Sequence, residues 1–251
     1  MLFLGTGSGR TSLTRGHTSL LFTNEAHNTL IDCGEGISKS LLQNNISFNE
    51  IDSVVISHLH ADHAAGLPSL LTQMKLVKRS EPFNIFIHTG LIEVLRGILG
   101  AFYIFGEGLP FELVFTGYEF GIPININSKL TLKGAKNSHL YNKYRIEYID
   151  SNNFTSASFL FTTSGKNLYY SADAGGGEDL FLFDEKIDFI ITETTHIPPE
   201  KFLQALVKYE PEKILLTHID DEIKLENWFN NLDKKIRRYF VITEDSMKFD
   251  I

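Results

Sequence analysis

The chain has 251 residues, a formal net charge of −8 and a hydrophobic fraction of 43%. These values indicate a folded globular protein with a sizeable core, and they give no support to a nonspecific nucleic-acid binder, which is usually basic. The single cysteine, Cys33, excludes an intrachain disulfide and fits a reducing compartment as a small buried thiol. No apolar run is long enough to span a membrane and the first residues do not resemble a signal peptide, so we expect a cytoplasmic protein without a membrane partner.

Short apolar runs between glycine-rich and polar turns predict a series of strands with helices between them. The predicted strands span residues 1–4, 17–22, 28–32, 51–56, 83–87, 113–115, 129–132, 145–149, 158–162, 168–171, 187–192, 213–217 and 240–243. The predicted helices span residues 35–43, 62–77, 91–105, 198–209 and 222–236. Strands and helices alternate in two halves, which predicts an α+β protein with a sheet-on-sheet core and helices outside. We expect a single domain over residues 1–251.

The segment 57–63 has the sequence Ser-His-Leu-His-Ala-Asp-His and directly follows the apolar run 54–56. His58 and His60 are two residues apart, so their side chains point the same way at the end of a strand. Asp62 and His63 lie beyond a turn and can face a second point. Imidazole nitrogens and carboxylate oxygens are ligands of zinc, and they also suit manganese or iron. The motif therefore predicts two adjacent metal ions; the alternative is a polar loop whose histidines only form hydrogen bonds.

This motif resembles the His-x-His-x-Asp-His signature of the metallo-β-lactamase superfamily of dinuclear metal hydrolases. The glycine-rich segment 3–9, the segment 31–36 and the run 58–71 resemble more narrowly the branch of ribonuclease Z, the tRNA 3′-processing endonuclease, and related phosphodiesterases. The resemblance covers most of the chain and weakens after about residue 90. It implies an αββα sandwich, in which two mixed β-sheets pack face to face with helices outside.

A site for two metal ions needs further ligands, and three residues at the ends of predicted strands can supply them. His139 follows the strand 129–132, Asp173 follows the strand 168–171, and His218 follows the strand 213–217. The resemblance implies that one ion is held by His58, His60 and His139, and the other by Asp62, His63 and His218, with Asp173 bridging both. The expected cofactors are two divalent ions, Zn²⁺ in the first place with Mn²⁺ or Fe²⁺ as alternatives. A hydroxide between them would be the nucleophile, which places Asp62 among the catalytic residues.

Two further carboxylates have expected supporting roles. Asp32 ends a predicted strand and is either an orienting partner of a metal-binding histidine or an ordinary turn acceptor. In ribonuclease Z, a His-Glu-Ala-Thr segment carries a histidine that assists the leaving group, but Thr192 stands at that position here, which is a departure. We expect His196 to act as the general acid instead, oriented by Glu193. The alternative is that His196 only precedes a helix that begins near two prolines.

The interval between His139 and Asp173 bears on the substrate. It contains only 33 residues and no basic cluster, whereas the resemblance implies a long, basic, glycine-rich arm that grips tRNA. Affinity for folded RNA depends on neutralising several phosphates. We therefore expect a phosphodiesterase that acts on a small phosphodiester, such as a cyclic nucleotide or dinucleotide, with an RNA 3′ end as a second candidate. The alternatives are a hydrolase of carboxylic esters, lactones or thioesters, and a noncatalytic metal-binding partner module.

The stretch 98–105 is unusually apolar for a surface segment. It fits the interior of a core helix, the wall of a substrate pocket or the interface of a homodimer.

Overall fold

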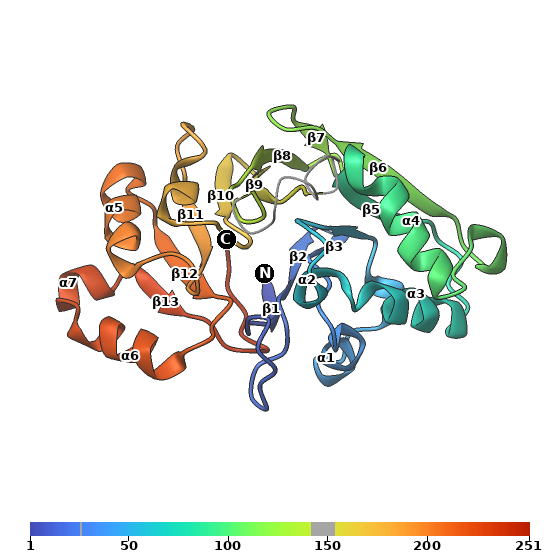
Figure 1. Cartoon of the computed structure of the whole chain (residues 1–251), viewed down its shortest axis with the longest axis horizontal. Helices are drawn as coiled ribbons and strands as arrows, with labels where there is room; N and C mark the ends of the chain where they lie inside the picture. Colours follow the sequence, from blue (N-terminus) through green and yellow to red (C-terminus); the bar gives the residue numbers. More distant parts are fainter. Residues whose placement is uncertain (26, 142–153) are drawn as a thin grey trace. The chain divides into compact units, whose positions relative to one another are not determined.

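The computed structural model describes residues 1–25, 27–141 and 154–251, which form two compact units. The first unit contains residues 1–119, 154–155 and 245–250, and the second contains residues 120–141, 156–244 and 251. Each unit has its own mixed β-sheet and its own hydrophobic core (Figure 1). The strand predicted at 145–149 lies outside the described residues. Every strand predicted within them overlaps an observed one.

The first unit is built on a six-stranded sheet in which the strands follow one another in chain order. An antiparallel meander is followed by parallel pairing from the third strand onward. The strands are β1 (Leu2–Gly5), β2 (Ser19–Asn24), β3 (His27–Ile31), β4 (Ser53–Val55), β5 (Phe83–His88) and β6 (Leu113–Tyr118). The central parallel strand β4 is buried throughout, and β5 is apolar and buried except at Asn84 and His88, as strands covered on both faces usually are.

The helices of the first unit are α1 (Ile37–Gln43), α2 (Ala61–Ala64), α3 (Leu67–Leu76) and α4 (Ile92–Ala101), with 3₁₀ turns at η1 (Phe48–Glu50), η2 (Thr89–Leu91) and η3 (Gly106–Gly108). The single helix predicted at 62–77 is wrong, because it is divided at Gly66. The amide of Gly66 donates to the carbonyl of Cys33, and a Cβ there would lie 2.1 Å from the carbonyl oxygen of Gly34. This close approach of two backbones separates the short helix α2, which carries two of the predicted ligands, from the core helix α3.

Helix α4 ends earlier than predicted. Leu95 and Leu99 are buried in the core of the first unit, which fits the core-helix interpretation of this stretch. Phe102, Tyr103 and Phe105 follow the helix and are 62%, 87% and 56% exposed. The second half of the apolar stretch 98–105 therefore lies on the surface of its unit.

Residues 245–250 run beside β1 and complete the first unit. The amide of Phe3 donates to the carbonyl of Met247, and the amide of Ser246 donates to the carbonyl of Phe3. The carboxylate of Asp245 accepts hydrogen bonds from the amides of Thr6, at 2.9 Å, and Gly16, at 2.6 Å. Asp245 thus closes the neck of the loop that joins β1 to β2, which we call the glycine-rich loop (residues 6–16).

The second unit is built on a seven-stranded sheet with the order β13-β12-β11-β10-β9-β8-β7. The strands are β7 (Ile124–Asn125), β8 (Leu130–Lys136), β9 (Ala157–Thr163), β10 (Lys166–Tyr170), β11 (Phe189–Glu193), β12 (Lys213–Thr217) and β13 (Phe240–Ile242). Pairing is antiparallel from β7 to β10 and parallel from β10 to β13. Ser164 and Gly165 form the tight turn between β9 and β10, and both have positive φ, as a two-residue turn with the favoured twist requires. The two-residue strand β7 was not predicted.

The helices of the second unit are α5 (Pro199–Tyr209), α6 (Glu222–Asn231) and α7 (Lys234–Arg237), with the 3₁₀ helix η5 (Gly177–Phe181). The prediction of a single helix over 222–236 is wrong. The backbone is extended at Leu232, and a new helix, α7, begins after Asp233. The Asp233 side chain accepts from the amide of Lys235 and caps α7. None of the helices among the described residues has the length and apolar character needed to cross a bilayer.

Candidate metal centre

Three of the predicted histidines come together within the first unit. His58 follows β4, and His60 has extended backbone angles immediately before α2, which carries His63. The ring centroid of His58 lies 4.7 Å from that of His60 and 4.3 Å from that of His63. The turn between β4 and α2 therefore brings the three imidazoles together; the proximity of His58 and His60 agrees with their spacing of two residues, and His63 lies beside them.

Asp32 lies beneath these histidines and is completely buried. Its carboxylate accepts hydrogen bonds from the amide of Ser57 at 2.8 Å, from the hydroxyl of Ser57 at 2.9 Å, and from Nδ1 of His63 at 2.7 Å. Because the only hydroxyl proton of Ser57 points to Asp32, Nδ1 of His58 must donate to the Ser57 oxygen, 3.0 Å away. Asp32 thus orients two histidines, one directly and one through a serine, in the manner typical of carboxylates behind metal-binding imidazoles.

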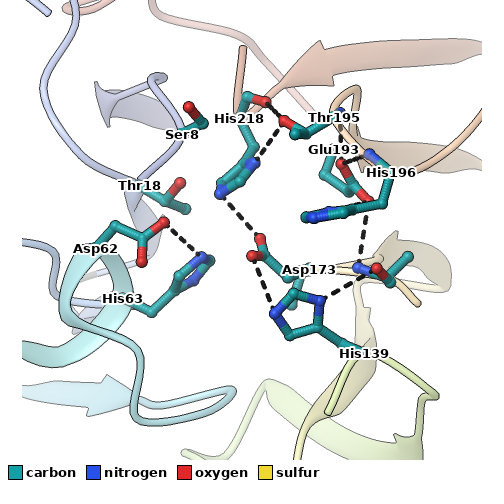
Figure 2. A network of polar contacts seen from close by, with 12 residues as sticks. Ser8, Thr18, Asp62, His63, His139, Asp173, Glu193, Thr195, His196 and His218 are labelled. Atoms are coloured by element: carbon teal, nitrogen blue, oxygen red, sulfur yellow. Dashed lines mark hydrogen bonds and ion pairs between the residues drawn. The ribbon is translucent and has the colours of Figure 1, made fainter. Parts of the chain in front are cut away.

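Asp62 extends from α2 beside His63, with its Oδ2 3.6 Å from Nε2 of that histidine (Figure 2). The glycine-rich loop approaches it closely, since a Cβ at Gly9 would lie 3.2 Å from Oδ2 of Asp62. A side chain at position 9 would crowd this carboxylate.

The second unit brings the other three predicted ligands together. The carboxylate of Asp173 lies between two imidazoles, with Oδ2 3.4 Å from Nε2 of His139 and Oδ1 3.0 Å from Nε2 of His218 (Figure 2). All three side chains are at most 4% exposed. Nδ1 of His139 donates to the carbonyl of Ala174 at 3.2 Å. The hydroxyl of Thr195 donates to the carbonyl of His218, so Nδ1 of His218 donates to the Thr195 oxygen at 3.2 Å.

Four histidines therefore share one tautomer, protonated at Nδ1 with the lone pair on Nε2. We call them the Nδ1-held histidines: His58, His63, His139 and His218. In a tetrahedral zinc site with bonds of about 2.0 Å, neighbouring ligand atoms are about 3.3 Å apart. The measured separations from Nε2 to carboxylate oxygen, 3.0, 3.4 and 3.6 Å, are close to that length. The donor set and its geometry within each unit thus fit a divalent metal ion.

Asp179, in η5, fastens the loops that carry His139 and Asp173, and sequence reasoning missed it. Its Oδ2 accepts from the amide of Ser138 at 3.0 Å, the hydroxyl of Ser138 at 2.8 Å and the amide of Gly175 at 2.7 Å. Gly175 packs so tightly on Ser138 that a Cβ would lie 2.3 to 2.5 Å from Ser138 atoms. The only nearby pattern was the run of three glycines at residues 175–177, which does not single out Asp179.

Asn137 makes a second connection between the same loops. Its side-chain amide donates to the carbonyl of Asp173 at 2.9 Å, and its oxygen accepts from the amide of His139 at 3.2 Å. The loop that carries His139 and the loop that carries Asp173 are therefore each held by the preceding strand and by a hydrogen bond to the other loop.

Glu193, at the end of β11, contacts His196 as predicted. Its Oε2 accepts from the amides of Thr195 at 2.6 Å and His196 at 2.8 Å, and its Oε1 lies 3.2 Å from Nδ1 of His196. Glu193 is buried, whereas the side chain of His196 is 29% exposed. The ring of His196 lies edge to face with that of His139 at 5.1 Å (Figure 2). Thr192, which stands where the ribonuclease Z segment has its histidine, is fully buried.

Comparison with known proteins identifies the family. A profile described as Anti-Pycsar protein Apyc1 matches residues 1–235. The chain belongs to this Apyc1 family. It is also 31% identical, over 146 residues, to ribonuclease Z of Clostridium tetani (strain Massachusetts / E88), an alignment that covers 58% of this chain and 46% of that protein. The chain spans less than half the length of the curated ribonucleases Z with which it shares 31–37% identity.

Solved structures show the same fold. The metallo-β-lactamase-fold protein YhfI from Bacillus subtilis superposes with a TM-score of 0.76 at 17% identity, covering 98% of this chain and 96% of YhfI. The short form of human tRNase Z superposes with a TM-score of 0.71 at 20% identity and the same coverage. The Apyc1-family chain thus has the metallo-β-lactamase fold. The predicted α+β class with two mixed sheets and the predicted resemblance to the ribonuclease Z branch are both confirmed.

Proposed function

We propose that this protein is a dinuclear metal-dependent phosphodiesterase whose substrate is a small phosphodiester, a cyclic nucleotide. The tautomer shared by the Nδ1-held histidines carries the proposal, because it leaves the same ring nitrogen of each available to a metal. The Apyc1 family match supports a cyclic nucleotide as substrate, and the ribonuclease Z relatives support phosphodiester chemistry.

In this proposal seven side chains would hold two ions, as the sequence resemblance implies. His58, His60 and His139 would hold one ion, Asp62, His63 and His218 would hold the other, and Asp173 would be shared by both. Asp173 suits the bridging role, because its two oxygens face different histidines. We propose Zn²⁺ as the metal, since nitrogen and oxygen donors in this geometry suit it.

When bound, two such ions would lower the pKa of a water that they share and stabilise negative charge on the phosphoryl oxygens. Residues of the chain itself would orient the metal ligands. Asp32 and Thr195 keep Nδ1 of their histidines protonated, which fixes both the ring orientation and the ligand atom. Asn137 and Asp179 connect the loop that carries His139 to the loop that carries Asp173.

We propose that His196 protonates the leaving oxygen. Its Nδ1 faces Glu193, so a positively charged ring would be stabilised by that carboxylate and would present the Nε2 proton outward. The partial exposure of His196 lets a substrate reach it. The expulsion of a sugar alkoxide requires such a proton, because an alkoxide is a poor leaving group.

Composition supports a small substrate over folded RNA. The net charge of −8 and the absence of a basic cluster among the 33 residues between His139 and Asp173 leave little to neutralise an RNA backbone. Hydrolysis of an RNA 3′ end remains the second candidate within the phosphodiesterase class, because the curated relatives are ribonucleases Z.

The test is hydrolysis by metal-loaded protein of the 3′,5′-cyclic mononucleotides, a cyclic dinucleotide and the reporter bis(p-nitrophenyl) phosphate, beside a thioester and a lactone. We expect chelator-sensitive turnover of the phosphodiesters, and of the cyclic nucleotides above all. Turnover of only the carboxylic substrates would establish the ester-hydrolase alternative. Two bound metals with no turnover of any substrate would establish the noncatalytic module.

We further propose that residues 1–251 act as one catalytic domain and that the protein forms a homodimer in the cytoplasm. Phe102, Tyr103 and Phe105 support the dimer, because three adjacent aromatic side chains this exposed are costly to leave in water. Sedimentation equilibrium of the wild type and of a Phe102→Ser, Phe105→Ser variant tests it. A monomeric wild type would exclude the dimer.

A further inference from the structure

The second unit contains a cavity of about 520 Å³ outside the carboxyl ends of β11 and β12. Its walls come from the residues that follow these two parallel strands and from helices α5 and α6, including Ile197, Pro198, Phe202, Asp220, Lys224 and Trp228. Crevices at the carboxyl ends of parallel strands are the usual ligand sites of open sheets, and this volume lies within the range of small-molecule pockets.

The cavity adjoins the candidate metal centre through shared residues. Thr195 and His196 line it. Thr195 also holds His218, and the ring of His196 lies against that of His139 (Figure 2). A leaving group that takes its proton from His196 would therefore have the remainder of its structure beside this cavity.

The walls of the cavity are formed by packing within the protein itself. The ring of Trp228 lies edge to face against Phe202 at 5.6 Å and against Phe240 at 5.3 Å. Asp221, the residue that begins α6, accepts from the amide of Lys224 and fixes the first turn of that helix. An aromatic and aliphatic wall held in this way is preorganised, which lowers the entropic cost of binding a flat ring.

The polar lining distinguishes among substrate classes. Asp220 and Lys224 have opposite charges, and Thr194 adds a hydroxyl, so this cavity lacks the positive potential that a phosphate group needs. An aliphatic acyl chain offers no hydrogen-bonding groups to these polar side chains. A nucleoside satisfies both kinds of wall, since its base is flat and its ribose and base edges donate and accept hydrogen bonds.

We propose that this cavity binds the nucleoside portion of the substrate, an inference that rests on the proposed phosphodiesterase function. Asp220 accepts hydrogen bonds from a ribose hydroxyl or an exocyclic amine. Lys224 donates to a base carbonyl or ring nitrogen. The cavity then determines which phosphodiesters the enzyme prefers, while the metal centre and His196 carry the chemistry.

The experiment compares kcat/KM for a cyclic nucleotide with kcat/KM for bis(p-nitrophenyl) phosphate, which lacks ribose and base. We expect Asp220→Ala and Lys224→Ala each to lower the ratio of these constants by about tenfold, the loss that follows from one charged hydrogen bond. Glu226→Ala is the matched control, because Glu226 is an exposed residue of α6 outside the cavity lining, and the ratio should stay at the wild-type value. Metal content and thermal melting show whether each variant is folded and loaded.

Calorimetric titration of the free nucleoside gives a readout that needs no turnover. We expect the wild type to bind it and Asp220→Ala to bind it about tenfold more weakly. An unchanged ratio in both variants, or the absence of nucleoside binding to the wild type, would overturn the proposal. Nucleoside binding by a protein that hydrolyses no phosphodiester would instead contradict the proposed function and leave the cavity as a nucleoside site.

Discussion

Asp32 and His63 are joined by a hydrogen bond of 2.7 Å between two completely buried side chains that lie 31 residues apart in the sequence. The same carboxylate also accepts a hydrogen bond from the hydroxyl of Ser57, and the oxygen of that hydroxyl accepts one from Nδ1 of His58. Asp32 therefore fixes the orientation of two predicted metal ligands, His63 directly and His58 through Ser57.

Replacement of Asp32 should weaken metal binding while keeping all the ligands. We expect Asp32→Asn to lower metal affinity by about 10- to 100-fold, because an amide is a poorer acceptor for Nδ1 of His63 and can present the wrong edge. Competition with a chromogenic chelator measures the affinity. The control is Asp184→Asn, a fully exposed position of the second unit that should bind metal like the wild type. Equal affinities in the two variants would contradict the orienting role.

Removal of the bridging carboxylate should abolish turnover. We expect Asp173→Ala to reduce phosphodiester hydrolysis to the level of the chelated wild type, since both histidines that face this carboxylate lose their common partner. Circular dichroism should show that secondary structure is retained. Wild-type activity in this variant would refute the proposed ligand set.

Two adjacent glycines offer a matched test of the loop connection. A methyl group at Gly175 would overlap Ser138, whereas a methyl group at Gly176 meets nothing within 4 Å. We expect Gly175→Ala to lower the free energy of unfolding by about 1–3 kcal/mol and to weaken metal binding, because the loop carrying His139 must shift. Gly176→Ala should leave both quantities unchanged, and chemical denaturation with metal titration measures them. Equal behaviour of the two variants would contradict the close packing.

His196 should matter in proportion to how much the leaving group needs a proton. We expect His196→Ala to lower kcat for a cyclic nucleotide by about 10²- to 10⁴-fold, and to lower kcat for bis(p-nitrophenyl) phosphate far less, because nitrophenolate leaves without protonation. Losses of the same size on both substrates would remove His196 as the general acid.

The thiol of Cys33 should be unreactive in the folded protein. Burial, and then the charge of Asp32, raises the pKa of Cys33 well above its ordinary value, and its side chain is completely inaccessible. Titration with a thiol-specific disulfide reagent at pH 8 should detect no thiol in native protein and one thiol after denaturation. Rapid labelling of the native protein would show that the strand end at Cys33 opens.

The sequence predicted the parts of the site whose geometry is local. His58, His60 and His63 are brought together by one strand end and one turn, and their spacing alone indicates that arrangement. His139 and His218 were proposed because each follows a predicted strand: His218 comes directly after β12 and His139 three residues after β8.

Contacts that depend on the meeting of two loops were not predictable in this way. Asp179 acts through Ser138 and Gly175, which are 41 and 4 residues away in the sequence. Nothing in the pattern around Asp179 distinguishes it from a solvated acidic residue. The prediction of one helix over 62–77 failed for a related reason. At Gly66 the backbone of Gly34 approaches closely, and the spacing of apolar residues along the sequence contains no information about such a contact.

The clamp made by Asp245 on the glycine-rich loop has a consequence for the order of folding. Its hydrogen bond to Thr6 joins residues 239 positions apart, so this bond forms only after residue 245 has left the ribosome. The sheet β1–β6 can pair before that moment, but the loop beside Asp62 is fastened only when residues 245–250 dock beside β1. A chain that lacks residues 245–250 would carry the complete histidine motif, but the glycine-rich loop beside Asp62 would not be held by Asp245.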